Sequence, residues 1–151
     1  MDENRISVIV PIYHGKQYLS EIIRQLEACQ SALKGSGYCI ELLLINDAPD
    51  EMIEEQNSAA FSVYTYNTEK NRGIHGARVY GLSKCHGEYV LFLDQDDCIC
   101  SDYFVSQLRN IGEYDAVVCR LINEKKTCYN YDFDFEKSIS REYMLTVGTA
   151  I

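Results

Sequence analysis

Apolar and polar positions alternate along the chain in blocks that predict strands and helices in turn. The block Ile6–Val10 is almost continuously apolar and rich in β-branched residues, which predicts a buried strand. Pro11 lacks a backbone donor, and we expect it to end this strand. Apolar residues then recur at helical spacing between residues 19 and 33, and two glycines follow as helix-end signals. The first unit is therefore a strand followed by a helix.

The same alternation continues through most of the remaining chain. Further strands are expected at residues 40–45, 62–66, 88–93 and 116–122, and further helices at residues 50–60, 73–84, 101–112 and 140–146. For the helix over 101–112, we expect Ser101 as the N-cap and Gly112 as the end. Its buried face is expected to consist of Phe104, Val105, Leu108 and Ile111.

Strands that alternate with helices predict a three-layer α/β fold whose central sheet is mainly parallel. In such sheets, ligands bind beyond the carboxyl ends of the strands. Tyr13, Asp47 and the acidic segment Asp94–Asp97 each follow a predicted strand. We therefore expect these side chains to meet at one edge of the sheet.

Length and composition predict a single globular domain over residues 1–151, since 46% of the residues are hydrophobic and 25% are charged. No apolar run reaches the roughly 20 residues of a membrane-spanning helix. Met1–Arg5 has neither the basic region nor the cleavage site of a secretory signal. These features predict a cytoplasmic chain without a membrane span.

Charge and cysteine content exclude several classes of function. The formal net charge of −9 would repel a phosphate backbone, so we expect no nucleic-acid partner. The seven cysteines are odd in number and include no Cys-x-x-Cys pair, which argues against a disulfide framework and a zinc site. We expect them to be reduced and mostly buried. Cys98-x-Cys100 could bind a soft metal, but the neighbouring carboxylates favour a hard cation.

The segment Tyr89–Asp97 is an apolar run that delivers three carboxylates, Asp94, Asp96 and Asp97, into the turn that follows it. Like charges at this density resist burial unless a cation lies among them. Oxygen ligands suit Mg²⁺ or Mn²⁺. The alternative is a solvated acidic turn after a strand.

Taken in order, several short motifs resemble the family 2 glycosyltransferases over about residues 5–120. They are Ser7 to Tyr13, Leu44 to Asp47, Asn71-Arg72-Gly73, Ala77-Arg78, Gly87-Glu88-Tyr89 and Leu93 to Asp97. The resemblance implies the A-type glycosyltransferase fold, which binds nucleotide sugars. It also implies sugar transfer with inversion, assisted by a divalent metal, Mg²⁺ or Mn²⁺.

The resemblance assigns the nucleobase pocket to residues that follow the first two strands. Pro11 and Tyr13 would border the base, with the Tyr13 ring against it. The alternative for Tyr13 is an aromatic residue that closes a strand end. Asp47 would hydrogen-bond the base, as a fixed carboxylate facing an N–H group can do. Its alternative is a turn residue within Asn46–Asp50.

The resemblance also assigns the diphosphate and metal sites. Asn71 and Gly73 would form a loop under the nucleotide, and Arg78 would face the diphosphate or lie solvated on its helix. Asp96 would coordinate the metal directly, Asp97 would be a second acid on the metal side, and Asp94 would face the ribose or a metal-bound water.

The implied function is metal-dependent inverting transfer from a nucleotide-diphosphate sugar, with a uridine diphosphate sugar favoured, to a glycan or lipid-linked acceptor. The bound cation would act as a Lewis acid on the leaving diphosphate. Such a role belongs to the biosynthesis of cell-surface polysaccharides or similar glycans.

The chain departs from the family pattern at two local positions and in one larger respect. His14 stands where the family commonly has Asn, and the turn over residues 46–50 is one residue shorter than usual. The larger departure concerns the general base that an inverting transferase needs, which in the family lies well beyond the Asp-x-Asp motif.

No residue of this chain is assigned as the general base. Asp132, Asp134 and Glu136 are available acids, but the alternation of residues 129–135 is typical of a strand. We therefore expect the general base to lie beyond Ile151, and the chain to be the N-terminal, donor-binding part of a longer enzyme.

Two other functions are weighed against glycosyl transfer. A non-catalytic nucleotide-sugar-binding module would keep the donor site without performing transfer. A haloacid-dehalogenase-type phosphatase would use Asp94 as nucleophile and Asp96 as acid and base, but there the motif belongs to the first strand of the core. A dinucleotide-binding dehydrogenase is disfavoured because no Gly-x-Gly-x-x-Gly follows a strand. The apolar end of the chain is a candidate surface for pairing with a second copy.

Overall fold

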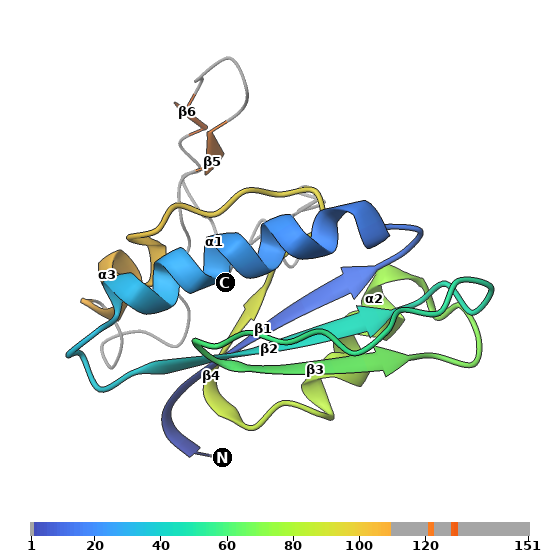
Figure 1. The fold of residues 1–151 in the computed structure, drawn as a ribbon, viewed down its shortest axis with the longest axis horizontal. Helices are drawn as coiled ribbons and strands as arrows, with labels where there is room; N and C mark the ends of the chain where they lie inside the picture. The colour runs from blue at the N-terminus through green and yellow to red at the C-terminus, as the bar shows by residue number, and fades with distance from the viewer. Residues whose placement is uncertain (1, 110–120, 123–127, 130–151) are drawn as a thin grey trace, which may run out of the picture.

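Four strands form one sheet in which every neighbouring pair runs parallel (Figure 1). The computed structural model describes residues 2–109, 121–122 and 128–129. The sheet has the order β3-β2-β1-β4, with β1 at Asp2–Ile12, β2 at Cys39–Asn46, β3 at Ser62–Asn67 and β4 at Gly87–Phe92. The helices are α1 at Leu19–Ala32, α2 at Gly73–Leu82 and α3 at Tyr103–Leu108, with a 3₁₀ turn η1 at Lys16–Tyr18. Strands β5 at Leu121–Ile122 and β6 at Cys128–Tyr129 form a separate antiparallel pair.

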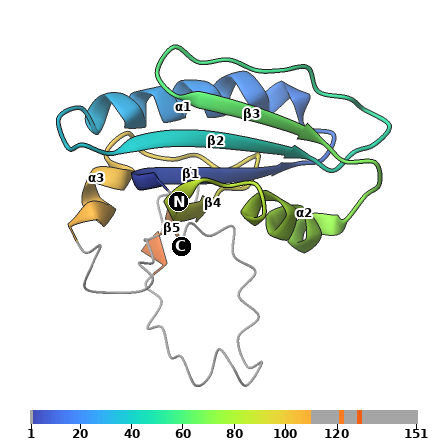
Figure 2. The same cartoon turned by 90° about the horizontal axis from the view of Figure 1, so that it is seen from below.

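The sheet is the middle of three layers, as the sequence predicts (Figure 2). Successive side chains of a strand point to opposite faces. Val8 and Val10 of β1 pack in the core that contains α1 and Phe104 of α3, whereas Ile9 packs with Ala77 of α2. Because β1 is buried on both faces, its sequence is continuously apolar rather than alternating.

The order of the strands places a crevice beside β1. The chain moves from β1 to β2 to β3 in one direction, and α2 then returns it across the other face of the sheet to β4. The connection after β1 leads to α1 on one face of the sheet, whereas the connection after β3 leads to α2 on the other face. In open parallel sheets, this reversal of strand order is where ligands bind.

The predicted end of the first strand at Pro11 is wrong, because β1 continues to Ile12. The Ile9 carbonyl accepts the Leu93 N–H at 3.1 Å, and the Ile12 carbonyl accepts the Asp47 N–H at 2.8 Å. Alternate residues of a parallel strand face the same neighbour, so Pro11 faces the β4 side, past the last residue of β4. The missing donor of Pro11 thus removes no ladder bond.

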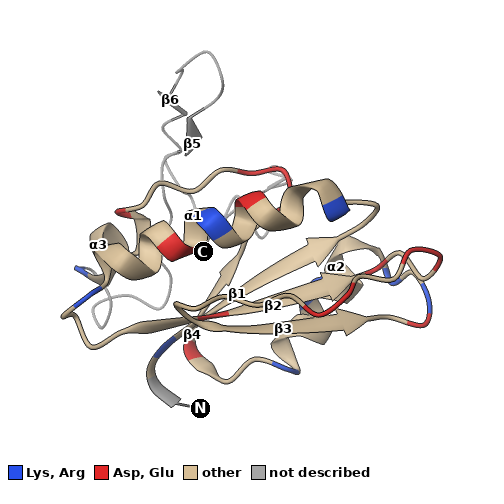
Figure 3. Cartoon of the chain, viewed as in Figure 1, with Lys and Arg blue, Asp and Glu red and all other residues tan. Residues whose placement is uncertain are grey.

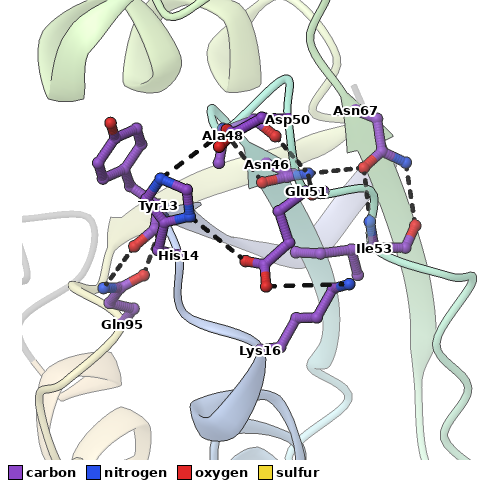
Figure 4. Close-up of polar contacts among 10 residues, drawn as sticks. All are labelled: Tyr13, His14, Lys16, Asn46, Ala48, Asp50, Glu51, Ile53, Asn67 and Gln95. Carbon is purple, nitrogen blue, oxygen red and sulfur yellow. Dashed lines mark hydrogen bonds and ion pairs between the residues drawn. The ribbon is translucent and has the colours of Figure 1, made fainter.

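The helix predicted over residues 50–60 is also wrong, because the structure has no helix there. Side-chain amides take the place of helical hydrogen bonds (Figure 4). Asn67 accepts the Ile53 N–H at 2.9 Å and donates to the Ile53 carbonyl at 3.0 Å, while Asn46 donates to the Glu51 carbonyl at 2.6 Å. This buries Ile53 and fixes the start of the connection against the ends of β2 and β3.

Two smaller predictions need correction. The N-cap of α3 is Asp102 rather than Ser101. The five cysteines in the described part of the chain are all free, as expected. Only Cys29 among them is buried, so the expectation that the cysteines are mostly buried is wrong for the described residues.

Other predictions lie outside the described residues. They are residues 116–120 of the strand expected over 116–122, the helix expected over 140–146, and the surface for pairing at the apolar end of the chain, whereas residues 121–122 of that strand form β5. The general base expected beyond Ile151 also lies outside them, since Ile151 is the last residue of the sequence.

A buried carboxylate, Glu41 of β2, links the middle of β1 to the start of β4. It accepts hydrogen bonds from the Ser7 hydroxyl at 2.5 Å and from the backbone N–H groups of His86 and Gly87 at 2.7 and 3.3 Å. The His86 ring and Arg5 lie 3.1 and 3.4 Å away. Burial raises the pKa of Glu41, but the hydrogen bonds from Ser7 and His86 outweigh it, so the net pKa is lowered. Glu41 therefore remains charged inside the fold.

Close packing of α2 on the sheet depends on Gly81. A methyl group at Gly81 would overlap Cγ2 of Ile9 and crowd Ile45. Ala77, one turn earlier, is the other buried position of the helix. Small residues at these two places bring the first turn of α2 to the carboxyl edge of the sheet.

Replacing Glu41 by Gln should lower the free energy of unfolding by about 1–3 kcal/mol at neutral pH, because a buried donor loses its charged acceptor. The lowered pKa of Glu41 means that its contribution is complete above the ordinary pKa of 4.5 and is lost as the pH falls below it. Denaturant unfolding measured from pH 7 to pH 3 should thus show that the difference in free energy of unfolding between Glu41→Gln and wild type becomes smaller in acid. Glu55→Gln, at an exposed site, is the control, and an equal effect of both variants would contradict this role.

Gly81→Ala should lower the free energy of unfolding by about 1–3 kcal/mol through overpacking, although alanine favours helices. Val79→Ala on the exposed face of α2 should change it by less than about 0.5 kcal/mol. Thermal unfolding measures both values. A neutral or stabilising Gly81→Ala would mean that α2 can shift away from the sheet without loss.

Candidate functional site

A cavity of about 340 Å³ opens at the carboxyl edge of the sheet, at the reversal of strand order. Residues from the ends of β1 and β2, the start of α2 and the turn after β4 meet in its wall. They are Pro11, Ile12, Tyr13, Asp47, Asn71, Gly73, Ile74, Ala77, Asp94, Gln95 and Asp96.

The cavity unites most of the predicted site residues. Pro11, Tyr13, Asp47, Asn71, Gly73, Asp94 and Asp96 all line it. Arg78 reaches it indirectly through its ion pair with Asp94, and Asp97 lies beside it without lining the wall. The predicted convergence of Tyr13, Asp47 and the acidic turn on one edge is therefore confirmed.

Asp47 lies in the floor of the cavity and is only 4% exposed. Its two carboxylate oxygens accept the Arg72 N–H at 2.8 and 3.0 Å, and the Thr68 hydroxyl lies 3.2 Å from Oδ1. The local turn is instead made by Asn46, which accepts the Ala48 N–H at 3.2 Å. Asp47 is thus a link between β2 and the loop before α2, rather than a residue of its own turn.

Two exposed apolar side chains face the solvent at the cavity. Tyr13 is 51% exposed and Ile74 is 48% exposed, and both line the wall. Gly73 adopts a φ of +70°, a conformation that favours glycine, and its N–H donates to the Asn71 side chain at 2.8 Å. This tight turn presents Ile74 at the start of α2. The arrangement offers apolar surface to a flat ring above a buried carboxylate.

The turn after β1 is held by charged side chains from the β2–β3 connection (Figure 4). His14 has a φ of +48°, a left-handed conformation that Asn adopts more readily than most residues. The imidazole lies 3.8 Å from Asp50 and 3.8 Å from Glu51, and Lys16 lies 3.9 Å from Glu51. The departure at His14 therefore keeps the backbone that an Asn would favour and adds a contact to the short turn over 46–50.

The acidic turn carries an internal counter-ion. Nη2 of Arg78 donates to Oδ1 of Asp94 at 2.6 Å, and both side chains are largely buried, with 16% and 23% exposed. The guanidinium also lies 5.6 Å from the centre of the Phe92 ring. Asp94 is thus neutralised by α2, whereas Asp96 is exposed at the cavity.

Acidic positions gather on the segment between β4 and α3 (Figure 3). Partial desolvation, followed by the charges of Asp94 and Asp96, raises the pKa of Asp97, while Arg78 lowers it. Repulsion of this kind is relieved when a cation lies among the carboxylates.

The family model described as Glycosyl transferase family 2 matches residues 7–146. The chain belongs to glycosyl transferase family 2. The resemblance stated from the motifs is therefore confirmed.

Relatives of this family 2 chain include named glycosyltransferases. It is 38% identical over 107 residues to an uncharacterized glycosyltransferase of Haemophilus influenzae, covering 68% of this chain and 40% of the relative. It is 31% identical over 118 residues to glycosyltransferase GlyA of Streptococcus pneumoniae, covering 76% of this chain and 16% of the relative. It is 33% identical over 112 residues to the minor teichoic acid biosynthesis protein GgaB of Bacillus subtilis, covering 72% of this chain and 12% of the relative. The chain thus spans less than half the length of these relatives.

A solved structure shares the fold of this family 2 chain. The crystal structure of S. aureus TarS matches with a TM-score of 0.55 and 22% identity, covering 78% of this chain and 21% of that chain. At this identity the likeness concerns the fold, a parallel sheet flanked by helices. The predicted A-type glycosyltransferase fold is confirmed. Among the described residues, no helix is both long enough and apolar enough to cross a membrane.

The residues of this family 2 site fit a cation only together with a ligand. Within the described part of the chain, no three His, Cys, Asp or Glu side chains cluster closely enough to bind a metal alone. Asp96 and Asp94 nevertheless offer carboxylate oxygens in the cavity. Mg²⁺ in nucleotide sites commonly takes one or two carboxylates and completes its shell with phosphate oxygens and water. The donor set suits such a shared cation.

Several lining residues were not identified from the sequence. Ile12, Ile74 and Ala77 are apolar and look like core residues in a single sequence, and Gln95 lies between the acids of the motif. The signal that could have identified Ile74 is its place directly after the turn glycine. Nothing local indicates that Gln95 contacts Tyr13, 82 residues earlier.

The effect of the neighbouring charges on the pKa of Asp97 can be tested by removing one charge at a time. Asp94→Asn should bring the pKa of Asp97 closer to its ordinary value, because one of the two repelling charges is removed. Arg78→Gln should raise the pKa of Asp97 further, because the lowering charge is lost. NMR titration of the Asp97 carboxyl carbon in the three proteins measures both shifts. Unchanged titration in both variants would show that these charges do not act on Asp97.

Proposed function

We propose that the cavity binds the nucleoside diphosphate of a sugar donor, with uridine diphosphate favoured. On this proposal, the chain supplies the donor site for inverting glycosyl transfer. The observation that carries the proposal is that one cavity has two chemically different ends. One end combines the apolar side chains of Tyr13 and Ile74 with the buried carboxylate of Asp47, and the other carries the carboxylates of Asp94 and Asp96. A nucleotide has a flat base at one end and a charged diphosphate at the other, and the two halves of the cavity match this division. Membership of family 2 supports the same substrate class.

The base would lie at the end of the cavity formed by Tyr13, Ile74 and Asp47. Tyr13 is 51% exposed, and its ring, which meets the His14 ring edge-on at 4.4 Å, would stack on a planar base. Asp47 keeps lone pairs beyond the bonds it accepts from Arg72, so an imide N–H of a uracil ring can still donate to it. Cytosine lacks this N–H at neutral pH, so the carboxylate favours uridine over cytidine.

The diphosphate would lie toward Asp94 and Asp96. Asp96 is exposed at the cavity and would hold a divalent cation, with Asp97 as a nearby acid of the same turn. When bound, Mg²⁺ or Mn²⁺ would supply Lewis-acid stabilisation to the leaving diphosphate. Arg78 keeps Asp94 neutralised, which lowers the negative potential that an approaching diphosphate meets. Asn71 and Gly73 would support the nucleotide from the α2 side.

We propose a glycan or lipid-linked acceptor, as in the building of a cell-surface polysaccharide. The relative GgaB, a minor teichoic acid biosynthesis protein, supports an acceptor of this kind. The cytoplasmic location and pairing with a second copy stay predictions.

The general base is proposed to lie beyond Ile151, in a continuation of the chain. The acids considered for this role within the sequence, Asp132, Asp134 and Glu136, lie outside the described residues, and we propose no base among them. The relatives support this proposal, because the chain covers only 40%, 16% and 12% of the three named above. An activity assay on a longer form that includes an acceptor region is therefore part of the test below.

Calorimetric titration with uridine diphosphate tests the donor site. Mn²⁺ should raise the affinity of the wild-type chain by about tenfold or more, within the range usual for two coupled ligands. Asp96→Ala should lose this gain and keep the metal-independent affinity, because the base end is untouched. Asp102→Asn is the matched control, since it removes one exposed carboxylate from the following segment.

The results separate the candidate functions. Failure of uridine diphosphate to bind, with Mn²⁺ or Mg²⁺ present or with neither, would contradict the proposed donor site. Binding without sugar transfer, in this chain and in a longer form that includes an acceptor region, would favour the non-catalytic module. Hydrolysis of a phosphate ester that depends on Asp94 would favour the phosphatase alternative.

A further inference from the structure

Gln95 forms a bridge between two sides of the cavity that are far apart in sequence. Its Oε1 accepts the Tyr13 N–H at 2.9 Å, and its Nε2 donates to the Tyr13 carbonyl at 3.2 Å. A single side-chain amide thus satisfies both backbone groups of one residue, as a neighbouring strand would do. Figure 4 shows the pair, with the His14 contacts on the other side of the same turn.

The chain leaves space for this bridge at Gly15. A methyl group at Gly15 would overlap the carboxamide of Gln95. The backbone of Gly15 has a φ of −119°, which any residue can adopt. Glycine at this position therefore leaves room for the Gln95 carboxamide, which a larger residue would displace, while the conformation of the turn itself suits any residue.

The bridge joins the two halves of the proposed donor site. Tyr13 lies at the base end, and its ring direction depends on the backbone that Gln95 holds. Gln95 itself lies between Asp94 and Asp96 in the turn that would bind the cation. A rearrangement of that turn that displaces the Gln95 carboxamide would therefore shift Tyr13 or break these two hydrogen bonds.

We propose that Gln95 is a positioning residue that couples the nucleobase end of the cavity to the carboxylate turn. Each end is then held in its binding geometry by the other, so nucleoside and cation bind cooperatively. This inference rests on the proposed function and deepens it, because it assigns the link between the two subsites to one side chain. Gln95 also lines the cavity, but the coupling assigned to it passes through the backbone of Tyr13.

The test breaks the bridge from each side separately. Gln95→Met keeps the length of the side chain and removes both hydrogen bonds, while Gly15→Ala displaces the carboxamide without changing Gln95. Both variants should keep the melting temperature of the wild type, because the Gln95–Tyr13 contact is exposed and water can replace it. Gln56→Met, on the β2–β3 connection, is the matched control for the Gln95 substitution.

The first measurement needs no ligand. Amide hydrogen exchange at Tyr13 should be faster in Gln95→Met and in Gly15→Ala than in wild type. The Asp47 amide, which donates to the Ile12 carbonyl at 2.8 Å, should be unchanged and serves as the internal reference. Equal exchange at Tyr13 in all proteins would overturn the bridge itself.

The second measurement uses uridine, which carries the base but no phosphate to bind a cation. Each single variant should bind uridine about threefold to tenfold more weakly, as expected for the loss of a neutral hydrogen bond. The double variant should be no weaker than either single variant, because both changes break the same bridge. The gain in uridine diphosphate affinity caused by Mn²⁺ should also be smaller in both single variants than in wild type.

The outcomes distinguish this inference from the proposed function. If wild type binds uridine diphosphate and the variants bind uridine equally well, the coupling by Gln95 is wrong and the donor site stands. If the two single effects add in the double variant, they act independently and the bridge is not their cause. If wild type binds neither uridine nor uridine diphosphate, the proposed function fails and the coupling fails with it.

Discussion

The parallel pairing of β1 with β2 on one side and β4 on the other is the constraint on which the rest of the structure depends. Parallel strands end at the same edge, so the loops after all three strands meet there. At the reversal of strand order, the chain after β1 leads to α1 on one face and the chain after β3 leads to α2 on the other, and a cavity lies at this edge. The cavity is a product of topology, and its chemistry comes from the few polar residues placed at the strand ends.

Polar side chains hold this edge together where backbone ladders stop. Asp47 accepts the Arg72 N–H, Asn67 pairs with the Ile53 backbone, and Gln95 pairs with the Tyr13 backbone. In each case a side chain substitutes for a neighbouring strand and satisfies groups that would otherwise face water. The site is therefore ordered by contacts of high sequence separation rather than by the propensities of its loops.

This division explains what the sequence predicts well. The strands, α1 and α2 follow from hydrophobic periodicity, and the convergence of Tyr13, Asp47 and Asp94 follows from parallel topology. The helix over residues 50–60 was wrong because the backbone there bonds to Asn46 and Asn67, which no local pattern reveals. Pro11 was misjudged because its effect depends on which neighbour it faces. Gln95 was missed because its partner lies 82 residues away.

The anchoring of Ile53 by Asn67 has a consequence for how the family can vary. The contacts of the β2–β3 connection with the cavity edge end at residue 53, since residues 54–61 do not line the cavity and instead contact α1 through Ser58 and the core through Phe61. The entropy of closing a loop rises slowly with its length. Insertions between residue 53 and the Ser58 contact would therefore leave the cavity unchanged, and this short stretch is where relatives can diverge in length, or where a label can be placed, without cost to the site.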